Sequence, residues 1–170
     1  SILTPDQLCR IIETLYNSFN IADDAEITIE VNPGTIKPDY FSQLQSKGIN
    51  RISLGIQSLS DSELKFLGRI HSRREALESL QAARKSFDNV SADVIFGLPN
   101  QTTKELAATL ELIIENDVTH ISSYLLTFDE GSQFTQMINS NLLSPLEDNI
   151  QERMFFKMIE FLTSHNLNQY

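Results

Sequence analysis

The chain has 170 residues, of which 41% are hydrophobic and 21% charged, the composition of a globular domain with a substantial core. Its net charge of −10 argues against a nucleic-acid partner, because phosphate binding needs a positive surface. No apolar run approaches the roughly 20 residues that span a bilayer. The single cysteine, Cys9, excludes an internal disulfide and fits a reducing compartment, so we expect a cytoplasmic protein without a signal peptide.

The first third of the chain alternates between helix and strand patterns. Thr4, Pro5 and Gln7 predict the start of a helix over residues 4–19, through a capping box and a proline at the first helical position. Its apolar stripe comprises Leu8, Ile11, Ile12, Leu15 and Phe19. A strand is predicted at 25–34 and a helix at 38–48, which Gly48 closes.

The same alternation continues to the end. We expect, in order, a strand at 49–57, helices at 60–68 and 72–87, a strand at 91–97, a helix at 103–116, a strand at 119–126, and helices at 132–141 and 145–166. One helix followed by four strand–helix units predicts an α/β fold with a parallel sheet, covering helices and right-handed crossovers.

The two faces of each predicted strand differ in polarity. One face is apolar: Ile27, Ile29, Val31, Ile52, Leu54, Ile56, Ala92, Val94 and Phe96. The opposite face is small, polar or charged and includes Glu30, Asn32, Ser53, Gln57 and Asp93. A flat sheet buried by helices on both sides would be apolar on both faces. We therefore expect a curved, barrel-like sheet whose concave face lines a ligand cavity, with the chemistry at the carboxyl ends of the strands.

Five ordered segments carry a family resemblance: "IEVNPGTI", "GINRISLGIQSL", "LGRIHSRREA", "DVIFGLPNQT" and "HISSYLLTFDEGSQF". Together they resemble the radical S-adenosylmethionine (SAM) enzymes of the oxygen-independent coproporphyrinogen III oxidase family, and most of all its heme-chaperone branch, HemW. The resemblance covers essentially the whole chain and implies a partial TIM-type (β/α)6 barrel. About four of the six parallel strands would be present, so that residues 1–170 form a fragment of the barrel core.

The resemblance also implies a [4Fe–4S] cluster, which three thiolates of a CxxxCxxC loop bind in this family. The sequence contains one cysteine, and its position beside Leu8 and Ile12 favours a small core residue over a ligand. We therefore expect the cluster ligands of the full-length protein to lie outside residues 1–170. On its own, this chain should neither hold the cluster nor cleave SAM reductively.

Four residues match the cofactor contacts of the family. The resemblance implies that Glu30 receives the ammonium group of SAM and that Arg69 pairs with its carboxylate, for which a guanidinium fork is a suitable donor. It further implies that Gln57 and Asp93 bind the ribose hydroxyls. Structural alternatives remain open: Asp93 can cap a turn or pair with a cation, Arg69 can bind helix-end carbonyls, and Glu30 and Gln57 can form a hydrogen-bonded pair across strands.

Histidines offer further candidates. His71 adjoins Arg69, and a surface position beside a helix is the simpler interpretation. His120 and Tyr124 share the inward face of the strand at 119–126, where either a heme contact or a hydrogen bond in the barrel floor is conceivable.

Two function classes follow from the resemblance. The first is a heme chaperone that binds heme and a [4Fe–4S] cluster and delivers heme to acceptor proteins. The alternative is an oxidase that decarboxylates the propionate side chains of coproporphyrinogen III. Because four of six strands would leave open sheet edges, we also expect a tendency to dimerise.

Overall fold

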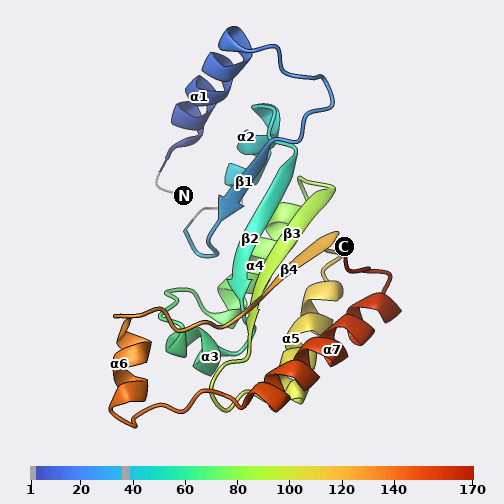
Figure 1. Ribbon diagram of the computed structural model, residues 1–170. Helices are drawn as coiled ribbons and strands as arrows, with labels where there is room; N and C mark the ends of the chain where they lie inside the picture. Colours follow the sequence, from blue (N-terminus) through green and yellow to red (C-terminus); the bar gives the residue numbers. More distant parts are fainter. Residues whose placement is uncertain (1–2, 36–38) are drawn as a thin grey trace.

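The computed structural model describes residues 3–35 and 39–170, and it confirms the predicted order of elements (Figure 1). The helices and strands are α1 (Pro5–Ser18), β1 (Thr28–Val31), α2 (Asp39–Ser46), β2 (Arg51–Gln57), α3 (Asp61–Phe66), α4 (Arg73–Arg84), β3 (Asn89–Phe96), α5 (Thr103–Ile114), β4 (His120–Leu125), α6 (Gln133–Asn139) and α7 (Asp148–Ser164). Pro38, predicted to begin the second helix, lies outside the described residues.

The four strands form one parallel sheet in the order β1-β2-β3-β4, so each strand pairs with the next in sequence. The carboxyl ends of the strands all point toward the end of the molecule where α3 and α6 lie (Figure 1). This arrangement is a series of parallel strand–helix units, as the alternating sequence patterns predicted. Strands β1 and β4 are the two edges of the described sheet.

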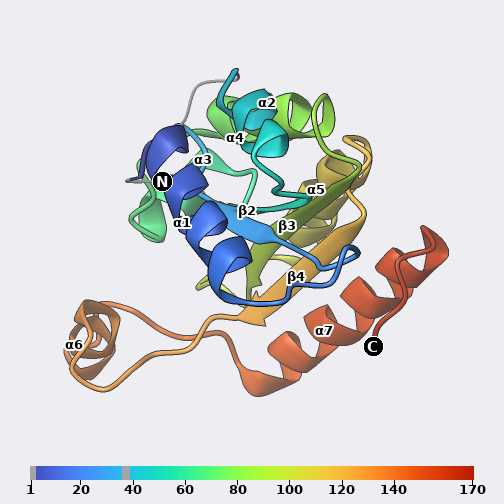
Figure 2. The ribbon, with the colours of Figure 1, turned by 90° about the horizontal axis from the view of Figure 1, so that it is seen from above.

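The hydrophobic core lies between the sheet and the helices that cover one of its faces (Figure 2). Most of the predicted apolar face of the strands is buried: Val31, Ile52, Leu54, Ile56, Ala92, Val94 and Phe96 are all at most 4% exposed, whereas Ile27 and Ile29 are partly buried. Helices α4 and α5 contribute apolar side chains to this core, including Leu80, Ala83, Leu106, Leu110 and Ile113. Burial of this face fixes which side chains remain for the opposite, polar face.

Three helices start with the same local device. In α1, α4 and α5 a Ser or Thr hydroxyl accepts a hydrogen bond from the third backbone N–H of the helix, and the side chain at that position bonds back to the cap. The pairs are Thr4 with Gln7, Ser72 with Glu75, and Thr102 with Glu105. Such capping boxes are written in four consecutive residues, which explains why these starts were predictable.

Helix α1 lies beside α2 and is only loosely attached to the rest (Figure 1). Leu8 and Ile12 pack against the core, but Ile11, Leu15 and Phe19 of the same predicted stripe are exposed, Phe19 by 65%. The helix that this stripe predicted is confirmed, but only part of the stripe is buried.

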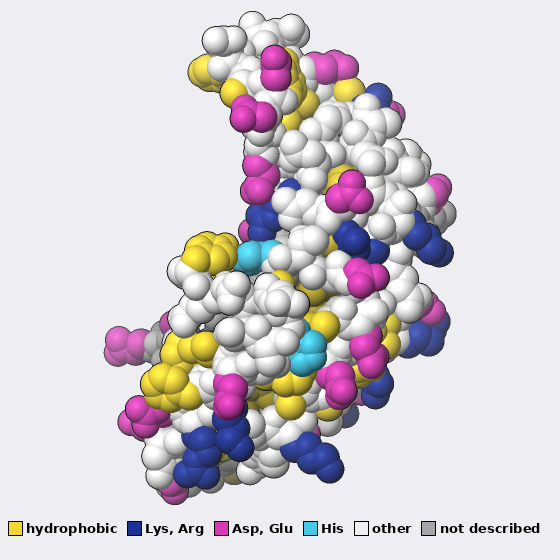
Figure 3. Space-filling view, turned by 90° about the vertical axis from the view of Figure 1, so that its right-hand side faces the viewer, with side chains coloured by type: hydrophobic (Ala, Val, Ile, Leu, Met, Phe, Trp, Pro, Cys, Tyr) yellow, Lys and Arg dark blue, Asp and Glu magenta, His cyan; other side chains and the backbone are white. Residues whose placement is uncertain are grey.

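A second apolar area lies along β4 and α7. Tyr124, Leu125, Phe155 and Phe156 are exposed large side chains on these two elements. Figure 3 shows apolar side chains gathered in the lower half of this face, among charges of both signs. No helix within the described residues is long and apolar enough to cross a membrane.

Candidate functional site

A line of polar side chains crosses the sheet on the face opposite the core. Glu30 of β1 stands in register with Ser53 of β2, Ser53 with Ser91 of β3, and Ser91 with His120 of β4. Neighbouring residues in register lie about 5 Å apart and point to the same face. The polar face predicted from the alternation of the sequence is therefore continuous over all four strands.

Asp93 lies on this face, two residues after Ser91 and therefore nearer the carboxyl end of β3. Its Oδ1 accepts a hydrogen bond of 3.1 Å from the hydroxyl of Ser53, and its side chain is partly buried. The carboxylate is thus oriented by a neighbour in β2 while Oδ2 makes no hydrogen bond with a described residue. An oriented acceptor of this kind suits a hydroxyl or an amino group of a ligand.

Gln57, the last residue of β2, has a conformation that the strand pattern did not predict. Its φ is +66°, and the pairing of β2 with β3 shifts register between Leu54 and Gln57. This irregularity breaks the regular alternation, so Gln57 does not simply continue the face of Ser53. Its side chain instead folds back over Gly55, whose missing Cβ would lie 3.1 Å from Gln57 Nε2 and 3.1 Å from Asn32 Oδ1.

The close approach over Gly55 brings two candidate polar groups together. Asn32 follows β1 and Gln57 ends β2, and both amides reach the same point above the Gly55 backbone. Only glycine leaves this space free, because any side chain at position 55 would push against one amide or the other. The carboxyl ends of β1 and β2 thus present two amides at one point.

Arg69 lies in the connection between α3 and α4, where its backbone N–H donates to the carbonyl of Leu64 over 2.9 Å. Its side chain is partly buried and forms no ion pair with a described residue. The same holds for Glu30, which is exposed. Both ions are therefore available to a ligand, and whether all four predicted residues converge on one cleft stays a prediction.

His71 is a buried anchor and not the surface residue that the sequence predicted. It is 5% exposed, and its Nε2 lies 3.3 Å from the carbonyl oxygen of Ile56, next to Gln57. Its Cβ also packs against Gly34 in the turn after β1. Desolvation lowers the pKa of His71, and the charge of Arg69 lowers it further, while the Ile56 hydrogen bond and Glu75 oppose the shift. His71 therefore holds the Arg69 segment at the end of β2.

His120 sits in the floor of the polar face. Its Nδ1 lies 2.8 Å from the hydroxyl of Ser91 and its Nε2 lies 2.7 Å from the hydroxyl of Tyr170. Desolvation, reinforced by the charge of Arg51, lowers the pKa of His120, which favours the neutral ring. With both ring nitrogens engaged, the hydrogen-bonded floor is the interpretation that the contacts support.

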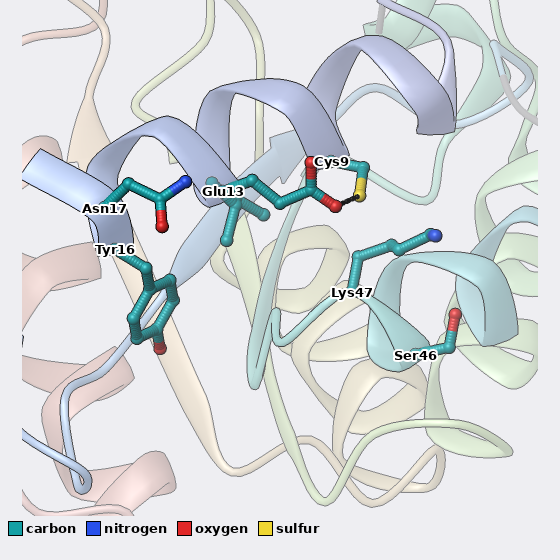
Figure 4. A pocket seen from close by; sticks show the side chains of 7 residues that line it. Cys9, Glu13, Tyr16, Asn17, Ser46 and Lys47 are labelled. Carbon is teal, nitrogen blue, oxygen red and sulfur yellow. Dashed lines mark hydrogen bonds between the residues drawn. The ribbon is translucent and has the colours of Figure 1, made fainter.

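Cys9 is not the core residue that its position predicted. It is partly exposed, and its Sγ donates a hydrogen bond of 3.0 Å to Glu13 Oε1 one turn along α1 (Figure 4). This hydrogen bond, with burial, raises the pKa of the thiol. Both residues border a cavity of about 410 Å³ between α1 and α2, together with Lys47.

The described residues do not fit an iron–sulfur cluster. They contain no group of three or more His, Cys, Asp or Glu side chains placed to hold a metal ion. A [4Fe–4S] cluster needs thiolate ligands, and Cys9 shares its proton with a carboxylate in mid-helix. The groups that SAM requires are present in this part of the chain: Glu30 is an anion, Arg69 between α3 and α4 is a cation, and Gln57 and Asp93 offer acceptors and a donor for a ribose. That they bind SAM together stays a prediction.

Comparison with known proteins agrees with this chemistry. Residues 4–113 match the sequence profile of the radical SAM superfamily. The chain is 33% identical over 171 aligned residues, its whole length, to radical S-adenosyl methionine domain-containing protein 1, mitochondrial, of Danio rerio, and 37% identical over 135 residues to heme chaperone HemW of Escherichia coli. These matches cover 38% and 36% of the two relatives, so the chain spans little more than a third of their length.

Solved structures show the same fold. Coproporphyrinogen III oxidase (HemN) from Escherichia coli, described as a radical SAM enzyme, superimposes with a TM-score of 0.80 over 96% of this chain and 38% of its own, at 26% identity. Methylornithine synthase (PylB) superimposes with a TM-score of 0.70 at 14% identity, over 95% of this chain and 44% of its own, which shows a shared fold alone. The four parallel strands with their helices are therefore part of a radical SAM barrel, and the chain belongs to the radical SAM superfamily.

Proposed function

We propose that this chain is the SAM-binding part of a HemW-like protein of heme metabolism. The observation that carries the proposal is the pair of polar arrangements toward the carboxyl ends of two neighbouring strands, β2 and β3: Asp93 oriented by Ser53, and Gln57 folded over Gly55. Ligands of α/β barrels bind at this end of the strands. The similarity to heme chaperone HemW and to the radical SAM domain-containing protein supports the assignment.

Each residue has a definite part in binding. Glu30 would pair with the ammonium group of SAM, and the Arg69 guanidinium would pair with its carboxylate in a fork geometry. Gln57 and Asp93 would bind the two ribose hydroxyls. In this superfamily SAM supplies radical chemistry once a [4Fe–4S] cluster has reduced it. The cluster ligands would come from outside residues 1–170, and the residues of this chain would hold and orient the cofactor.

Binding of SAM by the full-length protein, purified without oxygen and reconstituted with iron and sulfide, tests the proposal. Arg69→Ala and Glu30→Gln should each weaken SAM binding about tenfold or more, because each removes one partner of a charged pair. The iron content should stay unchanged. Arg74→Ala is the matched control, since Arg74 is an exposed arginine of α4 that pairs only with Glu78. Equal affinity of the Arg69 and Arg74 variants would contradict the assignment.

A heme-chaperone function is the main proposal for the whole protein, with heme as ligand and heme-acceptor proteins as partners. An oxidase that decarboxylates coproporphyrinogen III is the second candidate, because the superposition on that enzyme covers 96% of this chain. Titration of the full-length protein with heme, followed by its absorbance, should show saturable binding. Decarboxylation of coproporphyrinogen III in place of heme binding would favour the second candidate.

We propose a cytoplasmic location, as for a bacterial HemW-like protein. The relative from Danio rerio is named as mitochondrial. Fractionation of cells that express the tagged full-length protein distinguishes the two compartments.

A further inference from the structure

A buried polar network joins the loops that follow β2 and β3. The loop after β2 begins at Ser58, directly beside Gln57, and the loop after β3 begins at Gly97. These loops flank the two residues proposed to bind the ribose. Helix α3 lies between them at the carboxyl end of the sheet and contributes Glu63 (Figure 1).

Gln101 is the centre of the network and is 5% exposed. Its Oε1 accepts hydrogen bonds from the backbone N–H of Gly97 over 2.9 Å and of Leu98 over 3.4 Å. Its Nε2 donates to Glu63 Oε1 over 3.0 Å. Both ends of the amide therefore form hydrogen bonds. Its oxygen accepts from the backbone of the loop after β3, and its nitrogen donates to Glu63 in α3, 38 residues earlier in the chain.

Glu63 completes the connection to the other loop. Its second carboxylate oxygen accepts a hydrogen bond from the hydroxyl of Ser58, which is 1% exposed. The Ser58 oxygen in turn accepts from the backbone N–H of Ser60 over 3.0 Å. An unbroken chain of hydrogen bonds thus runs from the backbone after β3, through Gln101 and Glu63, to the residue next to Gln57.

The backbone on both sides of this network has unusual conformations. Gln57, Gly97 and Asn100 have φ values of +66°, +78° and +64°, in the left-handed region. Non-glycine residues in this region are held there by their surroundings at a cost in free energy. The hydrogen bonds of Ser58 and Gln101 lie immediately beside these residues, so the network is placed to hold both loops in their observed conformation.

We propose that Glu63 and Gln101 are positioning residues that hold the backbone conformation of Gln57 and so orient its side chain relative to Asp93, and with it set the recognition of the ribose hydroxyls of SAM. This inference rests on the proposed function of the site. Neither residue needs to touch the cofactor. Gln101 connects the backbone after β3, the strand that contains Asp93, to α3. Glu63 connects α3 to Ser58, the residue that follows Gln57. Because Gln57 pairs with Val94, the residue after Asp93, the sheet keeps the two strands together, and loosening either contact changes the conformation of the Gln57 end of β2 relative to Asp93.

The two side chains can be exchanged, and the exchange gives a sharp test. Gln101→Glu places two carboxylates against each other, and Glu63→Gln leaves one acceptor oxygen at position 63 in place of two, so that it can accept from Gln101 or from Ser58 but not from both. In the double variant Glu63→Gln/Gln101→Glu, the new carboxylate at 101 accepts from the Gly97 and Leu98 N–H groups and from the amide at 63. The amide oxygen at 63 accepts from Ser58. Every hydrogen bond of the network is restored in the double variant.

The measurement is the ratio of the affinities of the reconstituted full-length protein for SAM and for its 2′-deoxyribose analogue. The wild-type protein should prefer SAM, and each single variant should lose roughly tenfold of that preference, as expected for a misplaced hydrogen bond to a charged group. The double variant should regain it. A purely structural role of the network would lower the melting temperature without changing this ratio.

Ser58→Ala removes two hydrogen bonds, the one to Glu63 and the one from the Ser60 N–H, and it serves if a single variant at 63 or 101 does not fold; it should lower the ratio as well. An unchanged ratio in the folded single variants, or a folded double variant that fails to regain the preference, would overturn the positioning role. If the wild-type protein does not bind SAM at all, the proposed function fails instead, so the two failures are distinguishable.

Discussion

The hydroxyl of Ser53 donates a hydrogen bond to Asp93 Oδ1 over 3.1 Å, and this contact joins β2 to β3 on the polar face of the sheet. Ser53 is 7% exposed, so its hydroxyl has little access to water. Asp93 therefore keeps one orientation before any ligand arrives. Such preorganisation favours binding because the carboxylate need not be ordered at the moment of contact.

Ser53→Ala should weaken SAM binding by the full-length protein roughly tenfold or more, since a hydrogen bond to a charged group contributes about 1.5–3 kcal/mol. Equilibrium titration with SAM measures the effect. Ser91→Ala is the matched control: Ser91 is the neighbour of Ser53 in register, is fully buried and bonds His120 instead of Asp93. A larger loss of affinity in the Ser91 variant would contradict the role of Ser53.

Gly55→Ala should reduce SAM affinity by roughly tenfold, which corresponds to about 1.4 kcal/mol. The added Cβ would lie 3.1 Å from both Asn32 Oδ1 and Gln57 Nε2, so both amides would have to move. The backbone of Gly55 is not in the left-handed region, and the melting temperature should therefore change little.

Gly131→Ala is the opposite control for this prediction. Its φ is +81°, and no atom lies within 4 Å of the added Cβ. This variant should lose about 1–2 kcal/mol of stability through backbone strain but keep its SAM affinity. Calorimetry and titration of both variants distinguish a crowded site from a strained chain.

Stability should fall as the pH drops below about 6.5, the ordinary pKa of histidine. Desolvation lowers the pKa of His71 in the folded state, so between the two pKa values the unfolded chain binds a proton that the folded chain does not. The stabilisation is complete above pH 6.5 and is lost as the pH falls toward the folded pKa. His120 shifts in the same direction and adds to the effect.

Unfolding by denaturant at pH 7.5 and at pH 5.5 measures this loss, and His71→Gln should reduce the difference between the two. The glutamine amide can still donate to the Ile56 carbonyl but does not titrate. Capping hydrogen bonds lower the pKa values of Glu75 and Glu105, so these two residues change the stability only below about pH 4.5. A pH dependence unaltered by the substitution would show that His71 is not the group responsible.

The 170-residue chain expressed alone should self-associate, because β1 and β4 present unpaired backbone groups at the two edges of the described sheet. Sedimentation velocity at several concentrations tests this expectation. Tyr124→Lys, at an exposed position of β4, should reduce association, since a charged residue on an edge strand hinders pairing. A monodisperse monomer at all concentrations would show that the edges are protected in another way.

Local signals predicted most of the fold. The Thr4 and Gln7 capping box, the alternation of strands and helices, and the apolar face of Ile52 and Leu54 depend on neighbours in sequence, and the structure confirms them. The irregularity at Gln57 was not predictable, because it arises from a register shift against β3.

Long-range contacts account for the remaining errors. His71 is buried by the turn after β1 and by the end of β2, which lie 15 or more residues away in sequence. Glu63 and Gln101 were missed in the site for the same reason, since a hydrogen bond between residues 38 positions apart leaves no local pattern. Glutamine within "GLPNQT" resembles an ordinary loop residue until the fold brings α3 beside it.

At Gln57, stability to heat and the proposed binding of the ligand make opposite demands on one residue, because its backbone lies in the left-handed region. Glycine or asparagine would adopt its φ of +66° at lower cost, so either replacement would relieve strain in the resting protein. A laboratory selection for heat resistance alone should therefore drift toward Gln57→Gly or Gln57→Asn and lose cofactor affinity as it does so. Variants chosen for industrial or structural work on this barrel need both properties monitored together, because improvement in one conceals the loss of the other.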